Sequence, residues 1–289
     1  MHRFLLHNDS IHEASATLLT AGQTGLLNGW GVFSTMRVTD GALFAYERHW
    51  ARMKRDAELL RVAMPASSAW LEDRLLKLVE ANRASNATLR VVVVRNTGGA
   101  FQGPGIERDF DVIAFTTDLR DWGGSVRLGV VRQARHAASP FSGTKMLSWS
   151  FNLTWLEKAQ GDGYGEVVLL NERDYVSECT SANIFVSFGN RVWTPPLSAG
   201  CLPGVTRAIL LEEVRVPGIE IGERDLTLTD LEAADEVFIT STTRELLPVE
   251  SVEGLNISRR GSARQVLQAA FSSMLRAYSD ARGMASKGS

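Results

Sequence analysis

The chain has 289 residues, enough for one or two domains with substantial hydrophobic cores. Hydrophobic residues make up 44 % and charged residues 22 %, proportions typical of a soluble globular protein and not of a disordered or fibrous one. Its 31 Lys and Arg residues against 33 Asp and Glu residues give a net charge of −2, which argues against a nucleic-acid or anionic-membrane partner.

Alternating β-prone residues predict a hairpin near the start of the chain. Residues 31–38 and 42–46 flank the pair Asp40-Gly41, which is typical of a tight hairpin turn. Two helices are predicted next, with apolar faces made by Trp50, Met53, Ala57 and Leu60 in the first and Leu71, Leu75, Leu78 and Val79 in the second. Segments 88–95 and 110–117 are predicted strands, so the first half has an α+β pattern.

A polar segment that ends in two glycines, residues 117–124, is the predicted linker between two domains. We expect a small α/β domain over residues 1–119 and a larger one over 120–289. In the larger domain a helix is predicted to carry Leu147, Phe151 and Trp155, which recur at every fourth position. Its other predicted elements are strands at 125–133, 166–170, 175–178, 183–188, 191–194 and 236–241 and helices at 204–214 and 263–278. This pattern indicates a strand-rich, barrel-like domain flanked by helices.

Neither a dinucleotide fold nor a metal centre is predicted. The segment 29–34 (GWGVFS) resembles a dinucleotide-binding glycine motif, but it lacks the third glycine and runs into a strand. The five histidines show no metal-ligand spacing, and Cys179 and Cys201 are isolated. Free cysteines, no signal peptide and no apolar stretch long enough to span a bilayer lead us to expect a cytoplasmic protein.

Lys145 is the first residue with possible chemistry, and it allows two interpretations. Ser142 and Lys145 match the SxxK pattern, and Ser181 with Asn183 matches SxN, a combination typical of penicillin-recognising serine acyltransferases, although their KTG strand is absent. Lys145 also follows small residues and precedes an apolar pair, so partial desolvation would favour the neutral, nucleophilic amine. An ordinary solvated lysine is the simpler alternative.

Three further segments suit a phosphorylated aldehyde cofactor. Residues 202–207 (LPGVTR) place proline and glycine before a helix, where free N–H groups and the helix dipole can hold a phosphate. Residues 239–243 (ITSTT) gather hydroxyl groups at the end of a strand. Glu178 lies in the otherwise apolar segment 175–179, where a carboxylate needs a partner such as a protonated pyridine nitrogen. A plain helix start and a common turn are the alternatives for the first two.

These blocks occur in the order of a known family. Residues 178–185 (ECTSANIF), 194–197 (TPPL) and 202–207 resemble the class IV, or fold type IV, pyridoxal-phosphate enzymes, and the resemblance extends from about residue 29 to about residue 249. This family contains branched-chain and D-amino-acid aminotransferases and aminodeoxychorismate lyase. The resemblance implies a homodimer of chains with a small α/β domain, a larger pseudo-barrel domain and pyridoxal 5'-phosphate in the cleft between the domains.

The resemblance also implies roles for individual residues. Lys145 is expected to bond covalently to the cofactor and to act as the catalytic base, and Glu178 is expected to face the pyridine nitrogen. The remaining cofactor contacts that it implies are Arg52, Leu202, Val205, Thr206, Ser241 and Thr242. The candidate substrate contacts are Phe33, Arg37, Arg95 and Thr243, and for the two arginines a surface position on an edge strand is the alternative.

An aminotransferase that moves an amino group from an amino acid to a 2-oxo acid is the primary prediction. Phe33 favours a branched-chain-like donor, because the D-amino-acid enzymes usually have tyrosine there. Two departures weaken this choice: Trp30 replaces the usual acid, and residues 148–150 (SWS) lack the tyrosine of typical branched-chain enzymes. Residues 94–99 (VRNTGG) look similar to aminodeoxychorismate lyase, which forms 4-aminobenzoate and pyruvate. A serine hydrolase and a catalytically silent binding protein are the alternatives outside the family.

Overall fold

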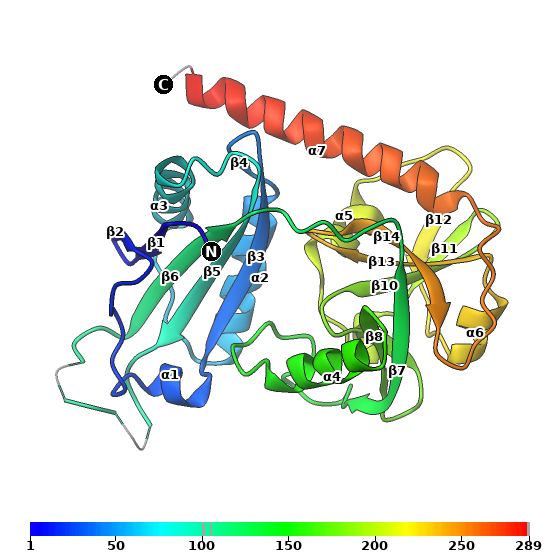
Figure 1. Cartoon of the computed structure of the whole chain (residues 1–289), viewed down its shortest axis with the longest axis horizontal. Coiled ribbons are helices and arrows are strands. Elements are labelled where there is room, and N and C mark those ends of the chain that lie inside the picture. Colours follow the sequence, from blue (N-terminus) through cyan, green and yellow to red (C-terminus); the bar gives the residue numbers. More distant parts are fainter. Residues whose placement is uncertain (100–101, 105, 288–289) are drawn as a thin grey trace. The chain divides into compact units, whose positions relative to one another are not determined.

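The computed structural model describes residues 1–99, 102–104 and 106–287. The chain divides into two compact units, each built on its own sheet (Figure 1). The first unit comprises Met1–Arg120, Lys145–Trp149 and Leu275–Ser289, and the second comprises Asp121–Thr144 and Ser150–Met274. Helices accompany a sheet in both units, which confirms the predicted α+β class.

The first unit contains a six-stranded antiparallel sheet with the strand order β2-β1-β6-β5-β3-β4. Its strands are β1 (Phe4–His7), β2 (Ser10–Glu13), β3 (Gly31–Thr39), β4 (Ala42–Leu43), β5 (Ala87–Arg95) and β6 (Phe110–Thr117). Asp40 and Gly41 both have positive φ angles between β3 and β4, so the predicted Asp-Gly hairpin is confirmed. Its second strand is shorter than expected, because a helix begins at Tyr46.

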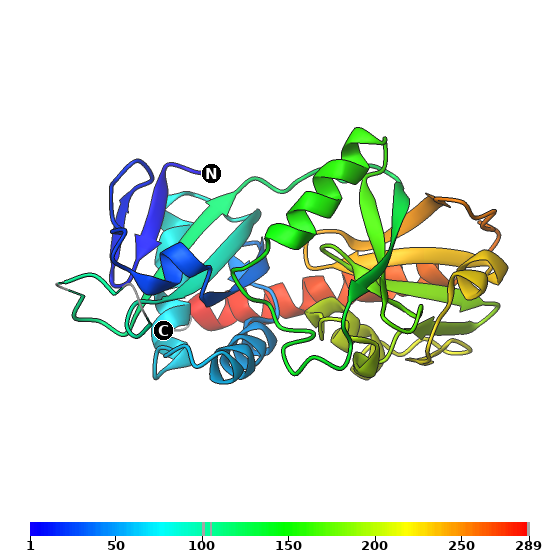
Figure 2. The ribbon, with the colours of Figure 1, turned by 90° about the horizontal axis from the view of Figure 1, so that it is seen from below.

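Two amphipathic helices, α2 (Tyr46–Leu59) and α3 (Ser68–Ala81), cover one face of this sheet (Figure 2). On α3 the fully buried Leu71, Leu75 and Leu78 recur every three or four positions, as the sequence predicted. Ser67 caps this helix, because its side chain accepts a hydrogen bond from the Trp70 N–H and satisfies one of the free donors of the first turn. The buried helix faces pack on alternate residues of β5, namely Ala87, Leu89, Val91 and Val93.

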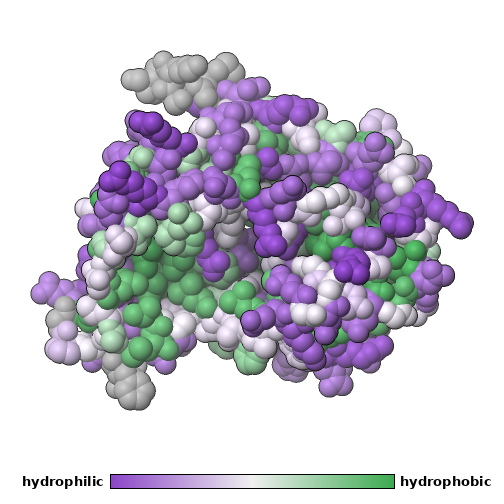
Figure 3. Space-filling view, viewed as in Figure 1, coloured by the Kyte–Doolittle hydropathy of each residue, from purple (hydrophilic) through white to green (hydrophobic). Residues whose placement is uncertain are grey.

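The opposite face of the sheet carries the other alternate residues. Phe33, Thr35 and Arg37 of β3 lie on it, together with Arg90 and Val92 of β5, because paired residues of neighbouring strands point to the same side. Apolar side chains gather on the surface of the first unit on this side (Figure 3). On this face of the sheet, Arg37 and Arg90 therefore lie beside apolar side chains.

Residues 145–149 belong to the first unit as an extended segment along β3. Met146 forms a bridge with Val32, and the Leu147 N–H donates to a β3 carbonyl at 2.9 Å. The following helix, α4, begins only at Ser150. The prediction that Leu147 shares a helix with the apolar residues after it is therefore wrong: backbone pairing with β3 overrides the helical spacing.

The second unit contains an eight-stranded mixed sheet with the order β12-β11-β10-β13-β14-β7-β8-β9. β7 pairs in parallel with both β14 and β8, and β12 pairs in parallel with β11. Its strands are β7 (Val126–Arg135), β8 (Glu166–Asn171), β9 (Val176–Cys179), β10 (Asn183–Phe188), β11 (Arg191–Thr194), β12 (Glu220–Glu223), β13 (Glu236–Ser241) and β14 (Glu245–Val252). The remaining elements of the chain are α1 (Thr24–Asn28), α4 (Ser150–Gly161), the single turn η1 (Leu197–Ala199), α5 (Val205–Glu212), α6 (Leu228–Ala233) and α7 (Ala263–Lys287).

This sheet curls around an apolar core. Val168, Ile184 and Ile239 point to the inside, and Leu231 of α6 packs among them. A short turn returns the chain from β9, the last strand in the order, to β10, the third, so the two ends of the sheet approach each other. α4 and α5 lie outside the curled sheet, on opposite sides of it in Figure 2. The predicted barrel-like domain flanked by helices is thus confirmed.

Candidate active site

The residues singled out from the sequence fall into two groups, one in each unit. The first unit holds Phe33, Arg37, Arg52, Arg95 and Lys145. The second unit holds Glu178, Leu202, Val205, Thr206, Ser241, Thr242 and Thr243. Each group is built by its own sheet and the segments beside it.

Lys145 is fixed by its backbone at the edge of β3. Its carbonyl accepts the Phe33 N–H at 3.1 Å, and its own N–H donates to the Asp56 carboxylate at 3.1 Å. Its Nζ lies 4.5 Å from the centre of the Phe33 ring and 4.4 Å from that of Trp149. The two rings contact each other edge to face. The amine is therefore presented against aromatic surfaces, which attract its cationic form through their ring quadrupoles.

Arg52 is held in a buried polar group on the helix side of the sheet. His49 and Arg52 are three residues apart on α2 and share its buried face. Arg52 donates to the Ser34 hydroxyl at 2.7 Å, and that hydroxyl lies 2.8 Å from His49 Nδ1. Burial lowers the Arg52 pKa to about 10, and burial together with Arg52 and Lys145 holds the His49 pKa well below its usual range.

Two nitrogens of this group have no hydrogen-bond partner. Both His49 Nε2 and Arg52 Nε are buried and unpaired. A buried donor without a partner costs about 1–3 kcal/mol. A cation held in this way by a serine and a neutral histidine is suited to an anionic ligand.

Arg90 is a site candidate that the sequence analysis missed. It lies on the same face of the sheet as Phe33, and its guanidinium carbon is 3.9 Å from the centre of that ring. Burial lowers its pKa, and no carboxylate among the described residues pairs with it. Strict alternation in β5 was the available signal, because it assigns Arg90 to the face opposite the core.

The two arginines that the sequence analysis did select have different surroundings. Arg95 donates to the carbonyls of Thr97 and Arg61 at 2.8 and 3.0 Å and stacks on Trp30 at 4.0 Å. These contacts hold the Arg95 guanidinium at the end of β5. Arg37 is half-buried on the face that carries Phe33 and Arg90.

In the second unit, Glu178 lies on the outer face of the curled sheet. It is opposite Leu169 of β8 and is buried. One carboxylate oxygen accepts the Arg135 Nε–H at 3.3 Å, and the other accepts the Leu202 N–H at 3.0 Å. Donors at both oxygens favour the ionised carboxylate. The structure therefore brings two of the predicted residues, Glu178 and Leu202, into direct contact.

The segment after Leu202 leads into α5 without a side-chain cap. Gly204 is the N-cap residue, and a Cβ there would overlap the side-chain oxygen of Asn183. Val205 and Thr206 begin the helix, where the first N–H groups have no acceptor within the helix. Such a helix start attracts anions through its N–H groups and its dipole.

The hydroxyl-rich turn follows β13. Thr240 pairs in register with Asn183, and its hydroxyl is buried and unpaired. Ser241 accepts the Arg244 N–H at 3.2 Å, and Thr242 and Thr243 after it are half-buried. Because β13 adjoins β10, this turn and the residues before α5 lie at the same part of the sheet.

Other polar groups of the second unit have structural contacts. Glu166 is fully buried and accepts hydrogen bonds from Thr180, Ser181 and Arg244, the last at 3.1 Å. Ser142, the serine of the SxxK pattern, donates to the Gly200 carbonyl at 3.1 Å. The hydroxyls of Ser142 in the SxxK pattern and Ser181 in the SxN pattern therefore both donate to local acceptors.

The cysteines are unsuited to nucleophilic chemistry. Burial raises the pKa of the Cys179 thiol well above its usual range and that of Cys201 to about 12. In the described part of the chain no cluster of three or more His, Cys, Asp or Glu side chains could hold a metal ion. Nor does any described helix have the length and apolarity needed to cross a bilayer.

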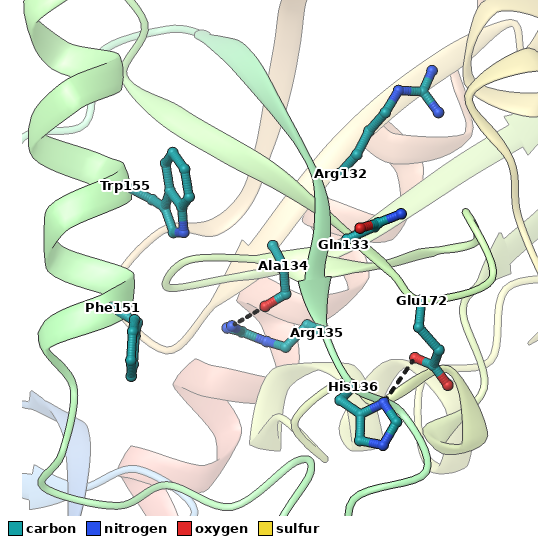
Figure 4. A pocket seen from close by; sticks show the side chains of 8 residues that line it. All are labelled: Arg132, Gln133, Ala134, Arg135, His136, Phe151, Trp155 and Glu172. Carbon is teal, nitrogen blue, oxygen red and sulfur yellow. Dashed lines mark hydrogen bonds and ion pairs between the residues drawn. The ribbon is translucent and has the colours of Figure 1, made fainter.

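A groove of about 650 Å³ lies between β7 and α4 (Figure 4). Phe151 and Trp155 line it from the helix, and Arg132, Arg135 and His136 line it from the strand end. Its charges are largely paired: Arg132 binds Asp174 at 3.2 Å, and His136 lies 3.9 Å from Glu172. The groove carries no converging set of unpaired groups.

The chain is similar in sequence and in fold to known aminotransferases. Residues 31–252 match the family described as amino-transferase class IV. A putative branched-chain-amino-acid aminotransferase from Methanocaldococcus jannaschii is 31 % identical over 82 % of this chain and 83 % of its own length. A D-alanine aminotransferase from Bacillus licheniformis is 30 % identical over 88 % and 89 %. The crystal structure of the Escherichia coli branched-chain amino acid aminotransferase superposes with a TM-score of 0.86 at 23 % identity and covers 95 % of each chain.

The family match spans most of the chain, and the fold is similar over nearly its whole length to that of a solved branched-chain amino acid aminotransferase. These findings confirm the resemblance and the fold type IV prediction. The chain belongs to the class IV aminotransferases, the transaminases that depend on pyridoxal phosphate.

Proposed function

We propose that this protein moves an amino group from an amino acid with an apolar, branched side chain to a 2-oxo acid, with pyridoxal phosphate bound through Lys145. The setting of Lys145 carries the proposal: its amine lies against Phe33 and Trp149, and Arg90 stacks on the same Phe33 ring. The amine that would condense with the aldehyde thus lies beside aromatic rings and beside an arginine that could bind a carboxylate, all on one sheet face.

The residues fit the functional groups of the cofactor. Arg52 offers a buried cation with an unpaired Nε–H for the phosphate. The uncapped start of α5 offers further donors. Glu178, whose two oxygens accept hydrogen bonds from Arg135 and Leu202, suits a protonated pyridine nitrogen. The full proposed set is Arg52, Lys145, Glu178, Leu202, Val205, Thr206, Ser241 and Thr242.

When bound, pyridoxal phosphate supplies a conjugated ring that accepts the electrons left at the substrate Cα. Lys145 would hold the cofactor through its amine, and the same amine would be the base that takes the substrate Cα proton. Glu178 would face the pyridine nitrogen and keep a proton on it. Phe33 and Trp149 exclude water from around the amine.

We assign the substrate carboxylate to Arg90 before Arg37 or Arg95. The guanidinium of Arg90 is on the face that carries Phe33, and it lacks an acidic partner among the described residues. Arg95 already donates to two backbone carbonyls. We expect Arg90→Gln to raise KM for the amino acid roughly 10- to 100-fold, the effect of one charge-assisted hydrogen bond. Arg95→Gln is the matched control and should leave KM unchanged.

A donor assay tests the function. The loaded protein is mixed with L-leucine, L-glutamate or D-alanine without an acceptor, and its visible spectrum is followed. We expect L-leucine to convert the spectrum to that of the aminated cofactor fastest. Lys145→Ala should lose the visible band of the covalently bound cofactor, and the control Lys158→Ala, a change on the exposed side of α4, should keep it.

Each other outcome of this assay has a definite meaning. A wild-type protein that binds no cofactor would overturn the proposal. Binding without conversion by any amino acid would point to the lyase of the same family, and aminodeoxychorismate would then release pyruvate. Faster conversion with D-alanine would refute the branched-chain donor alone.

We infer the remaining properties from the family resemblance. A homodimer is the expected assembly, and its substrates are small amino and 2-oxo acids in the cytoplasm. Sedimentation equilibrium measures the assembly directly, because the chain mass of 31.7 kDa gives a monomer and a dimer clearly separate values.

A further inference from the structure

Arg135 connects Glu178 to a buried polar network. Its Nε–H donates to Glu178 at 3.3 Å, and one terminal nitrogen donates to the Asn152 side chain on α4 at 3.1 Å. Asn152 in turn donates to the Thr180 carbonyl at 2.6 Å, one residue beyond β9. The strand that carries Glu178 is therefore tied to Arg135 both directly and through α4.

A bulge in β7 brings Arg135 into this position. Between Val131 and Arg135 the strand advances four residues while its partner β8 advances only two, from Leu169 to Asn171. Gln133, inside the bulge, has a φ of 52°, in the left-handed region that disfavours side chains other than glycine. In regular pairing, Gln133 would stand opposite Asn171, so the irregularity places an arginine where the strand would otherwise place a glutamine.

The neighbouring arginine shows what the bulge achieves. Arg132 projects away from α4 and pairs with the exposed Asp174, whereas the Arg135 guanidinium turns toward α4 (Figure 4). The side chain of Arg135 is only 17 % exposed, against 62 % for Arg132. Backbone strain of this kind persists only where the surrounding structure holds it in place, and strained residues cluster at functional sites.

We propose that Arg135 is a positioning residue: the β7 bulge holds its guanidinium on Glu178 so that this carboxylate stays ionised and fixed in direction. This inference rests on the proposed role of Glu178 toward a pyridine nitrogen. In a buried pair of a carboxylate and a pyridine, one proton is shared between them. A cation bonded to the carboxylate lowers its affinity for that proton, so the proton stays on the nitrogen. Without Arg135 the neutral pair is favoured, because burial disfavours separated charges.

The test compares Arg135→Met with Arg135→Lys, Glu178→Gln and the control Arg132→Met. Each protein is loaded with pyridoxal phosphate that carries ¹⁵N in its ring, and the nitrogen chemical shift reports whether the ring is protonated. We expect the protonated shift in wild type and in Arg132→Met and the neutral shift in Glu178→Gln and Arg135→Met. Arg135→Lys, which keeps the charge, should recover most of the protonated form.

The half-reaction with the best amino donor provides a second readout. We expect Arg135→Met to slow it about 10- to 100-fold, and the double variant Arg135→Met/Glu178→Gln to be no slower than Glu178→Gln alone, because Arg135 acts through Glu178. Multiplying losses would indicate a separate structural role and overturn the inference.

The two proposals fail in different ways. A protonated ring in Arg135→Met overturns the role of Arg135 and leaves the proposed function intact. A ring that stays protonated in Glu178→Gln, or a wild-type protein that takes up no cofactor, overturns the role of Glu178 and with it this inference. Gln133→Gly, which relieves the positive φ, should keep the wild-type shift, and Gln133→Val should move it toward the neutral one.

Discussion

Replacing Arg52 with methionine should affect the empty and the loaded protein in opposite directions. The side chain is buried on α2, and burial lowers its pKa from 12.5 to about 10. At 1.36 kcal/mol per pKa unit, the folded protein at pH 7 bears a cost of about 3 kcal/mol for this cation. Methionine has a similar length and no charge. The attraction between Arg52 and Asp56 is already contained in the lowered pKa, so the further loss is the hydrogen bond to Ser34, about 1 kcal/mol. We therefore expect the empty variant to be more stable than wild type by up to about 2 kcal/mol.

The loaded Arg52→Met variant should lose the part of the cofactor binding free energy that the Arg52 cation contributes through the phosphate. One charge-assisted hydrogen bond from the unpaired Arg52 Nε–H contributes about 1.5–3 kcal/mol, so the cofactor Kd should rise about 10- to 100-fold. At a cofactor concentration of 100 times the wild-type Kd, stabilisation by ligand is about 2.7 kcal/mol. With a 100-fold weaker Kd it falls to about 0.4 kcal/mol.

Urea unfolding with and without cofactor measures both effects in one set of curves. Lys54→Met is the matched control, because Lys54 lies exposed on the same helix and pairs only weakly, at 4.0 Å, with Glu58. It should leave both the Kd and the stability within about 0.5 kcal/mol of wild type. An Arg52→Met variant with an unchanged Kd would refute the reasoning, since the phosphate would then be held without this cation.

Three further predictions concern packing and reactivity in the second unit. Arg244→Met should destabilise the protein by about 3–5 kcal/mol in urea unfolding, because it leaves the buried Glu166 carboxylate without its cation; a loss below 1 kcal/mol would contradict this. Cys179 and Cys201 should not react with a thiol reagent at pH 8 until urea unfolds the chain, and rapid labelling of the native protein would contradict their burial. Gly204→Ala should weaken cofactor binding, because a Cβ displaces the start of α5; an unchanged Kd in equilibrium titration would show that the phosphate is bound elsewhere.

Elements with strong local periodicity were predictable from the sequence. The three-and-four spacing of α3 matches the structure almost residue for residue, and the β-branched segment 88–95 coincides with β5 to within one residue. β14 is absent from the predicted elements, and its middle residue Pro248, which lacks an N–H, is of a type that disfavours strands. In the structure β13 pairs with residues 245–248 and β7 pairs with residues from Val249 onward, so Pro248 lies where the pairing changes from one neighbour to the other. The four-residue spacing that begins at Leu147 predicts a helix there. The pairing of Leu147 with β3 joins segments far apart in the sequence, so no local pattern indicates it.

The residues of the candidate site also differ in whether a local sequence pattern reveals them. Glu178 and residues 202–207 were recognisable because their chemistry lies in short, contiguous motifs. Arg90 was missed because its relevance depends on which sheet face it occupies and on the ring beside it. Arg135 could not be found by alternation, since the bulge before it shifts the strand register. Contacts made by tertiary packing leave no local pattern to read.

His49 gives the fold a pH dependence whose direction follows from its burial. Its pKa is held well below the usual range by burial first and then by Arg52 and Lys145, so the imidazole stays neutral in the folded protein. The unfolded chain binds the proton near pH 6.5. The unfolded state therefore holds more protons below that pH, and stability falls by about 1.4 kcal/mol per pH unit as the solution becomes more acidic.

His49→Gln tests this prediction, because glutamine cannot bind that proton and can still form a hydrogen bond with Ser34. Between pH 7.5 and pH 5.5, wild type should lose about 1.4 kcal/mol more stability in urea unfolding than the variant. The other titrating groups are common to both proteins and cancel in the comparison. Equal losses in the two proteins would mean that His49 becomes protonated in the folded state, which its burial beside the Arg52 cation should prevent.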